Sequence, residues 1–295
     1  MPFEANDIST DEYIDRRLIE VQALMASSLA ETPLNFLASE SKGLLGNGKM
    51  LRARMPFRIG PVTGVPHKTL LHAATATEMI HSASLLHDDV IDGGLLRRGA
   101  PAFWVEKGVS GAILLGDMLL FKALDVICQV EDSRLAHPLV LFTGEVCQAE
   151  SEQELIFRGR DTEWEDCVRI ARCKTGALFA FTAFVCGGDD PDLREALKES
   201  GYEVGTAYQL SDDILDAKGS PVAAGKTLGT DSARDKNTVM TFLPEGIEPV
   251  AFIEALCASA RKRLGPWPDV QKAWDVYMEK DLMPGLEKHL HLIHS

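Results

Sequence analysis

The sequence predicts an all-α fold, and three features of its pattern point to that class. Long stretches carry apolar residues at intervals of three and four, which is the spacing of one helix face. Runs that alternate between apolar and polar residues, as strands do, are scarce. Clusters of Gly, Pro and Asp separate the helical stretches and are expected to form the connecting loops.

The expected helices follow one another along most of the chain. The strongest helical patterns cover residues 11–25, 68–92, 110–130, 139–157 and 163–188. Loops are expected at residues 43–49, 60–68, 93–101, 187–192 and 218–238. Several central helices are apolar nearly all round, which places them inside a large bundle that amphipathic helices wrap. No linker divides the sequence, so a single helical domain is expected over residues 1–295.

Composition limits the class of partner. The chain has 295 residues, 44 acidic and 30 basic, and its formal net charge of −14 disfavours nonspecific binding to nucleic acid or anionic membranes. The six cysteines have no metal-type spacing and are expected to be buried thiols in a reducing compartment. The first residues lack the layout of a signal peptide, and charges interrupt every apolar stretch before ~18 residues. No transmembrane segment and a cytoplasmic location are therefore expected.

One short segment concentrates negative charge beside the predicted core. In "LLHDDVIDGGLLRRG", Asp88 and Asp92 lie one helical turn apart, with ~6 Å of rise between them, and Asp89 lies alongside. Three like charges near a core are costly unless a positive charge compensates them. Mg²⁺ suits this role, because it takes oxygen ligands and often joins one or two carboxylates to a substrate's phosphates.

The same spacing occurs a second time. "QLSDDILDAKG" places Asp212, Asp213 and Asp216 at the end of another apolar helical stretch, again ahead of a basic loop that contains Lys226. Solvated surface charge gives no reason for such a duplication. The repeat therefore favours two helix ends that face each other across a cavity and hold a diphosphate through metal ions.

These motifs resemble the polyprenyl synthase family, the trans-isoprenyl diphosphate synthases. The resemblance runs from roughly Gly46 to Thr238. It is carried, in the family's order, by "GNGKMLRAR", "EMIHSASLLHDDVIDGGLLRRGAP", "LLGDMLL", "GEVCQ", "KTGALF", "YQLSDDILD" and "GKTLGTD". It implies an isoprenoid synthase-type bundle of about a dozen helices around a deep central cavity. It also implies a homodimer and a Mg²⁺ requirement, with about three ions bound together with the diphosphate.

The resemblance also implies roles for individual residues. An allylic diphosphate is expected to bind through Mg²⁺ to Asp88, Asp89, Asp92, Asp212, Asp213 and Asp216, and directly to Arg97, Lys174 and Lys226. Isopentenyl diphosphate is expected in a metal-free basic cradle made of Lys49, Arg52, His81 and Arg98. Thr175 and Gln209 are expected to present oxygens to a cationic intermediate. The implied reaction is a head-to-tail (1'-4) condensation that gives an all-trans polyprenyl diphosphate.

Product length is expected to depend on the helix that leads into Asp88. An isoprene unit is ~5 Å long, about one helical turn, so residues that face the chain act as a ruler. The expected rungs are Ala83, Ser84, Ile80 and Thr77, none of which is aromatic. The sequence therefore predicts products of twenty carbons or more, with a longer quinone-type tail favoured, and Ala83→Phe is expected to shorten them. Phe121 or Phe142 on neighbouring helices remains an alternative cap.

Three other functions share part of this pattern. A class I terpene cyclase has the helical fold and the first metal motif, but it usually has an Asn/Ser/Glu second motif and no second diphosphate cradle. A noncatalytic subunit of a heteromeric prenyl synthase commonly loses one aspartate motif, and both are intact here. An all-α nucleotide pyrophosphohydrolase tends to be smaller and rich in glutamate. The sequence favours condensation over all three.

Overall fold

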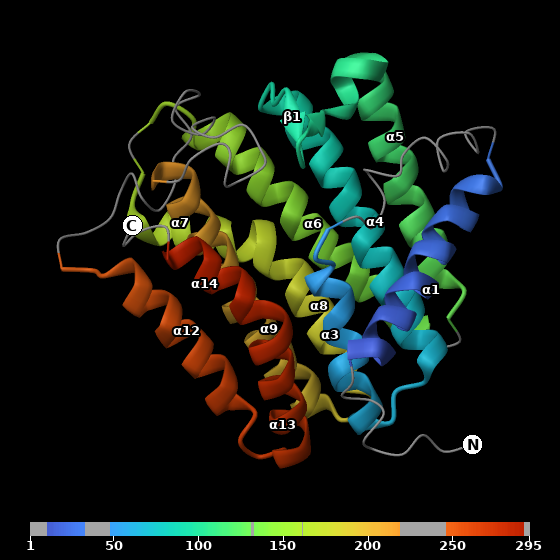
Figure 1. The fold of residues 1–295 in the computed structure, drawn as a ribbon, viewed down its shortest axis with the longest axis vertical. Helices are drawn as coiled ribbons and strands as arrows, with labels where there is room; N and C mark the ends of the chain where they lie inside the picture. The colour runs from blue at the N-terminus through green and yellow to red at the C-terminus, as the bar shows by residue number, and fades with distance from the viewer. Residues whose placement is uncertain (1–10, 33–47, 131–132, 161, 219–245, 292–295) are drawn as a thin grey trace.

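Helices form nearly all of the part of the chain that the structure describes, so the all-α prediction is confirmed (Figure 1). The structure is a computed structural model and describes residues 11–32, 48–130, 133–160, 162–218 and 246–291. The first half contains α1 (Asp11–Ala30), α3 (Leu51–Ile59), η1 (Gly60–Thr63), α4 (His67–Ile91), α5 (Phe103–Cys128), η2 (Ser133–Leu135) and α6 (Ala136–Glu152). The second half contains η3 (Gln153–Phe157), α7 (Trp164–Ala171), η4 (Arg172–Gly176), α8 (Ala177–Cys186), α9 (Pro191–Lys218), α12 (Pro249–Arg263), α13 (Pro268–Tyr277), η5 (Met278–Leu282) and α14 (Met283–His291).

The predicted loop at 93–101 contains a small hairpin. Strands β1 (Leu96–Arg97) and β2 (Ala100–Pro101) pair antiparallel, with Leu96 opposite Pro101 and Arg97 opposite Ala100. Arg98 and Gly99 form the turn with positive φ angles of 54° and 76°. A positive φ is unfavourable for Arg98, because arginine, unlike glycine, has a Cβ atom. The hairpin thus presents two neighbouring arginines just beyond the end of α4.

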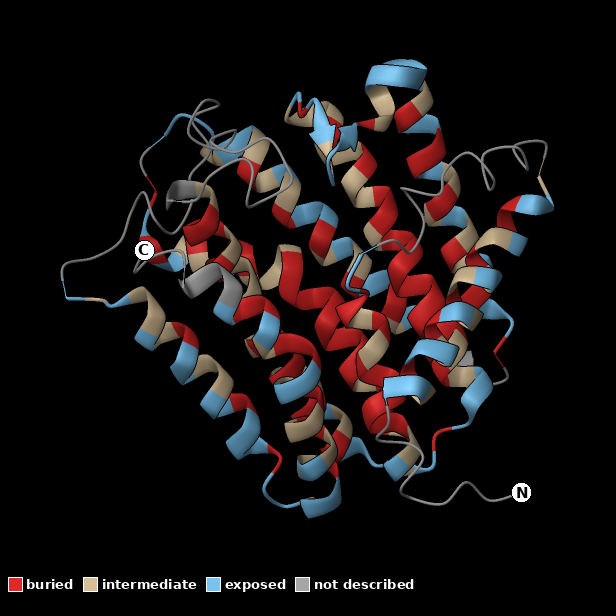
Figure 2. Ribbon diagram, viewed as in Figure 1, coloured by how far each residue is buried: buried red, intermediate tan, exposed pale blue. Residues whose placement is uncertain are grey.

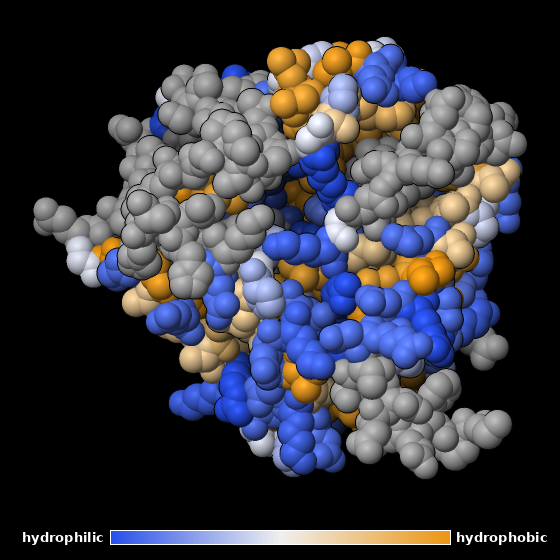
Figure 3. Space-filling model, in the orientation of Figure 1, coloured by the Kyte–Doolittle hydropathy of each residue, from blue (hydrophilic) through white to orange (hydrophobic). Residues whose placement is uncertain are grey.

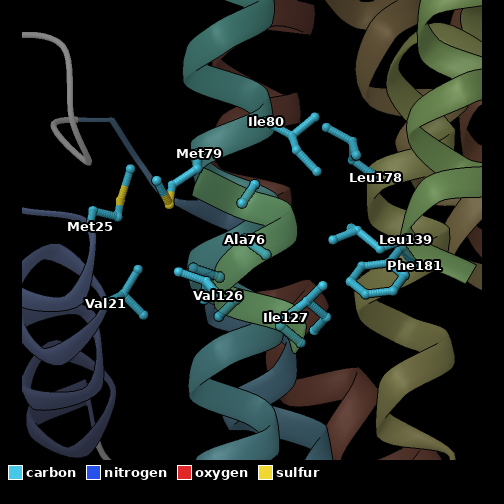
Figure 4. Packing of buried hydrophobic residues seen from close by; sticks show 14 of the residues in the cluster. Val21, Met25, Ala76, Met79, Ile80, Val126, Ile127, Leu139, Leu178 and Phe181 are labelled. Atoms are coloured by element: carbon cyan, nitrogen blue, oxygen red, sulfur yellow. The ribbon is translucent and has the colours of Figure 1, made fainter. Parts of the chain in front are cut away.

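The centre of the molecule is built from α4 and α8, as the apolar sequence of these stretches predicts. Every residue of α8 except Phe184 is buried, and α8 packs along α9 while α4 packs along α5. Figure 2 shows buried residues concentrated on these central helices, whereas α1 and α12 expose their outer faces. Ile80 of α4 faces Leu178 of α8 in the core (Figure 4). Burial of such a side chain contributes about 1.5–3 kcal/mol.

Two predicted helices contain π-helical turns. The stretch 139–157 is α6 followed by the π turn η3, and the stretch 163–188 is α7, the π turn η4 and α8 without a break. A π turn inserts a residue into the helix, changes the direction of its side chains and is frequent at functional sites. Here η4 contains Lys174 and Thr175, two of the predicted site residues.

A buried ion pair joins the two ends of the chain. Arg58 of α3 donates from Nε to Oδ2 of Asp281 in η5 over 2.8 Å, and a second nitrogen donates to Asp11 of α1 over 2.9 Å. The Arg58 and Asp281 side chains are only 1% and 2% exposed. Breaking such a pair by removing one partner costs about 3–5 kcal/mol, so this contact fixes α13 and η5 against α3. No helix in the described ranges has both the length and the apolarity to cross a membrane.

Candidate active site

Side chains of α3, α4, α5, α6, η4, α8 and α9 line one cavity of about 270 Å³. Its lining includes six of the residues predicted from sequence: Arg52, His81, Asp88, Lys174, Thr175 and Gln209. Apolar side chains, among them Ile80 and Leu178, also line it. The cavity therefore combines charged and apolar walls, which suits a ligand with a charged head and a hydrocarbon tail.

The first aspartate motif contains two kinds of carboxylate. Asp88 lines the cavity, whereas Asp89 is buried and accepts hydrogen bonds from Arg97, with Nε 3.0 Å from Oδ1. Asp92 is the C-cap residue of α4, and its backbone N–H donates to the Asp88 carbonyl over 2.7 Å. Asp89 thus orients an arginine of the β1–β2 hairpin, and Asp88 is the member of the motif that lines the cavity.

Arg97 connects the first motif electrostatically to the second. Burial alone would lower the pKa of Arg97, but the hydrogen bond to Asp89 and the charges of Asp89, Asp88 and Asp212 raise it. Asp88 lies at the end of α4 and Asp212 near the end of α9, more than 120 residues away in sequence. Asp88 and Gln209, which binds Asp213, line the same cavity, so the two helix ends lie at one site, and their charges act on the same guanidinium.

The second motif is tied to η4 by a chain of polar side chains. Gln209 donates from Nε2 to Oδ1 of the buried Asp213 over 2.7 Å, and its Oε1 accepts from the Thr175 hydroxyl over 2.5 Å. Two glycines allow this approach, since a Cβ on Gly205 would lie 2.6 Å from the Cα of Gly176. Asp212 and Asp216 are half-buried on the same end of α9.

Lys174 has two partners that the sequence analysis did not identify. Its Nζ forms an ion pair with Glu150 of α6 and donates to Oε1 of Gln153 over 3.1 Å. Burial would lower the pKa of Lys174, but the charges of Asp88, Glu150 and Asp92 and the hydrogen bond to Glu150 raise it. The apolar sequence around Lys174 indicates that an acidic partner such as Glu150 lies nearby, because an ammonium in apolar surroundings needs a counter-charge. Gln148 of the "GEVCQ" motif instead donates to Glu152 on an exposed face.

Three residues of the predicted basic cradle, Arg52, His81 and Arg98, lie close together, and Arg52 and His81 line the cavity. Burial lowers the pKa of His81 well below its usual value, and the charges of Arg52, Arg98 and Arg97 add to the effect, so the imidazole is neutral near pH 7. The Arg52 guanidinium stacks over the Phe179 ring at 4.7 Å, and its buried Nε has no hydrogen-bond acceptor among the described residues. Burial lowers the pKa of Arg52 and Arg98 as well. These groups suit an anionic ligand, which would supply the missing acceptors.

The remaining predicted residues are placed as follows. Lys49 is exposed and lies against α14 and Tyr208, whose charge acts on Arg52 of the cradle, and Lys226 lies outside the described residues. Ile80 and Ser84 line the cavity, whereas Ala83 and Thr77 are fully buried and do not. Phe121 is 71% exposed and so does not cap the interior, but Phe142 packs there against Phe181 and Tyr202.

The carboxylates fit Mg²⁺ by their chemistry rather than as a preformed cage. Within the described ranges, no three acidic, His or Cys side chains lie close enough together to form a metal site. Mg²⁺ commonly takes one or two carboxylates and completes its shell with water and substrate phosphates. Asp88 and Asp212, which share the field around Arg97, provide hard oxygen donors of that kind.

Comparison with known proteins identifies the family. A model of the polyprenyl synthetase family matches residues 36–244. A geranylgeranyl diphosphate synthase of Mycobacterium tuberculosis is 33% identical over 68% of this chain, and an octaprenyl diphosphate synthase of Haemophilus influenzae is 32% identical over 66%. Each alignment covers 60% of the relative's length. A polyprenyl synthase from Caulobacter crescentus, solved with calcium and isoprenyl diphosphate, has a TM-score of 0.72 and 23% identity, over 98% of this chain and 97% of that one. The chain is a member of the polyprenyl synthetase family.

Proposed function

We propose that the protein is a prenyltransferase that condenses isopentenyl diphosphate head to tail with an allylic diphosphate and forms an all-trans polyprenyl diphosphate. The observation that carries the proposal is one cavity that joins both aspartate motifs to a basic group. Asp88 and Gln209, which binds Asp213, line this cavity together with Arg52 and His81. A condensation needs two diphosphate sites of this kind. A terpene cyclase needs only the first.

The allylic diphosphate would bind at the aspartate motifs. Mg²⁺ held by Asp88, Asp92, Asp212 and Asp216 would neutralise its charge and stabilise the diphosphate as a leaving group. Arg97 and Lys174 donate hydrogen bonds to its oxygens. Negative charge grows on the diphosphate as its C–O bond breaks, so these fixed cations stabilise the transition state more than the bound substrate. Lys226 is proposed as a further donor from its place in the sequence motif.

Isopentenyl diphosphate would bind in the cradle of Lys49, Arg52, His81 and Arg98. Arginine forks match diphosphate oxygens, and the neutral His81 donates a hydrogen bond without adding charge. This site holds the double bond of isopentenyl diphosphate near the allylic carbon, so the two substrates react as if they were parts of one molecule. The new C–C bond forms as the double bond attacks the cation, and the released diphosphate accepts the proton lost in the final elimination. The oxygens of Thr175 and Gln209 face the cationic carbon.

The apolar wall of the cavity supports a product of twenty carbons or more. Ser84 and Ile80 line the wall next to Asp88, and neither carries an aromatic ring that would stop a chain at the first turn. The relatives include a geranylgeranyl and an octaprenyl diphosphate synthase, whose products span this range. The quinone-type tail, the single domain over residues 1–295 and the cytoplasmic location stay predictions.

A homodimer is proposed through the faces of α5 and α6. Large apolar side chains are exposed there at Val105, Val109, Ile113, Leu114, Phe121, Val140 and Leu141. Apolar atoms gather at the top of the molecule in Figure 3, over the hairpin and the start of α5. Exposed apolar side chains of this number commonly mark an interface. Light scattering is expected to give a dimer for the native protein and a monomer for the double variant Leu114→Glu, Phe121→Glu.

The activity is tested with the pure protein, Mg²⁺, labelled isopentenyl diphosphate and allylic primers of five to twenty carbons. The expected result is a labelled polyprenyl diphosphate, with one diphosphate released for each isopentenyl unit added. Asp88→Ala and Asp212→Ala serve as controls and abolish product. A cyclic hydrocarbon without label would identify a cyclase. No turnover unless a second protein is added would identify a noncatalytic subunit.

A further inference from the structure

Helix α14 contains a buried glycine, Gly285, at a helical position where glycine costs stability. A Cβ at this position would lie 2.9 Å from Nζ of Lys49 and 3.4 Å from Cε2 of Tyr208. Carbon and nitrogen atoms do not approach to 2.9 Å without a hydrogen bond, which an alanine methyl group cannot make. Because glycine has no side chain, Gly285 leaves room for the Lys49 ammonium.

The neighbouring cation is placed in the same way. A Cβ on Gly48 would lie 2.6 Å from Nη2 of Arg98. Gly48 directly precedes Lys49 in the chain. Lys49 therefore lies against Gly285, and Arg98 lies against Gly48, so each of these two cations of the basic cradle has a glycine beside it. Helix α14 also packs along α9, which contains Tyr208 and Gln209. Helix α14 thus forms a wall beside Lys49, although its residues lie outside the part of the chain that matches the family model.

We propose that Gly285 is a positioning residue for the second diphosphate, which binds without metal, and that it acts by leaving the space in which the Lys49 ammonium reaches the cradle. The inference rests on the proposed function, because it assigns isopentenyl diphosphate to that cradle. It adds a determinant of affinity in the C-terminal helix. Gly285 is not part of the carboxylate site for the allylic diphosphate, so a substitution at Gly285 is expected to leave the affinity for that substrate unchanged.

Gly285→Ala has opposite effects on stability and on binding. The group that a new methyl meets most closely is the end of a flexible lysine side chain, which moves aside at little cost. Alanine also forms helix better than glycine, so the melting temperature stays unchanged or rises. The displaced ammonium loses its hydrogen bonds to the diphosphate, which weakens binding roughly tenfold. A purely structural role for Gly285 would instead lower stability and binding together.

The test is a double-mutant cycle read by calorimetric binding of isopentenyl diphosphate. It compares the native protein with Gly285→Ala, Lys49→Ala and the double variant. Both single variants are expected to bind roughly tenfold more weakly, and the double variant no more weakly than Lys49→Ala. Affinity for an allylic diphosphate with Mg²⁺ is expected to be unchanged in Gly285→Ala. The control is Gly144→Ala in α6, where a new Cβ meets nothing within 4 Å and binding of isopentenyl diphosphate is expected to be native.

Each outcome separates this inference from the proposed function. Native protein that does not bind isopentenyl diphosphate contradicts the proposed function. Native binding together with unchanged affinity in Gly285→Ala overturns the inference and leaves the function intact. Additive losses in the double variant also overturn it, because Gly285 would then act independently of Lys49.

Discussion

Arg97 donates from Nε to Oδ1 of Asp89 over 3.0 Å, and this contact separates Asp89 from the two other aspartates of its motif. The Asp89 side chain is 7% exposed beneath the guanidinium, whereas Asp88 lines the cavity. The motif therefore combines a carboxylate that holds an arginine with carboxylates that we propose as metal ligands.

Substitutions in this motif are expected to separate the two roles. Asp88→Asn removes a metal-facing charge and is expected to lower kcat by roughly 10³-fold. Asp89→Asn is expected to lower kcat only about tenfold and the free energy of unfolding by about 1–2 kcal/mol, because the partly exposed Arg97 loses its charged partner. Steady-state rates over a series of Mg²⁺ concentrations, together with urea unfolding, measure both effects. If Asp89→Asn needed as much additional Mg²⁺ as Asp88→Asn to reach its full rate, this result would identify Asp89 as a metal ligand.

Glu150 is expected to restrain Lys174 rather than to take part in the reaction. Lys174→Met removes a cation from the diphosphate site and is expected to lower kcat roughly 10²-fold. Glu150→Gln keeps a hydrogen-bond acceptor but removes a negative charge near the diphosphate, so the KM for the allylic substrate is expected to fall about threefold. Kinetics with the allylic substrate varied test this difference. A loss of kcat in Glu150→Gln as large as in Lys174→Met would contradict the restraining role.

Sequence reasoning predicted the helical class and several of the residues that line the cavity, because these features are local. The spacing of Asp88 and Asp92 on one helix, and the apolar run of α8, are set by neighbours in the chain. The duplicated motif then indicated that the ends of α4 and α9 lie together, and their joint effect on Arg97 supports this arrangement.

Features that depend on distant contacts could not be predicted. Asp281 pairs with Arg58 across more than 220 residues, and no local pattern distinguishes Asp281 from a surface aspartate. The division of the first motif into two kinds of carboxylate depends on the hairpin turn, in which Arg98 adopts a positive φ. Burial of Ala83 and Thr77 on the flanks of α4 likewise follows from the helices that pack there.

The low pKa of His81 predicts a specific loss of stability in acid. An unfolded histidine takes up a proton near pH 6.5, whereas burial and three arginines keep folded His81 neutral well below that value. Stability from this group is therefore complete above pH 6.5 and falls as the pH falls, by at most about 1.4 kcal/mol per pH unit. Urea unfolding between pH 5 and 7.5 measures the free energy of unfolding of the native protein and of His81→Gln. The contributions of the other titrating groups cancel in the difference between the two proteins. Equal slopes in the two proteins would show that His81 titrates normally.

Ser84 and Ile80 are expected to determine product length, because both line the cavity one turn apart on α4. Ile80 faces Leu178, and Leu139 and Phe181 lie beyond them in the core (Figure 4). Ser84→Phe puts a ring into the first turn of the path and is expected to shorten the product by at least one isoprene unit, ~5 Å. Ile80→Ala opens the next turn and is expected to lengthen the product by about one unit, with a cost of about 2–4 kcal/mol in stability.

Ala83→Phe provides the comparison, since sequence alone predicts that it shortens the product. Ala83 is fully buried beside the cavity lining, so a ring there overpacks the core and costs about 1–3 kcal/mol. Any shortening in Ala83→Phe should therefore accompany a lower melting temperature, whereas Ser84→Phe should shorten the product with little change in melting temperature. Reversed-phase separation of the dephosphorylated products measures chain length in each variant. A native product from Ser84→Phe would mean that the growing chain leaves the aspartates by a path that does not follow α4.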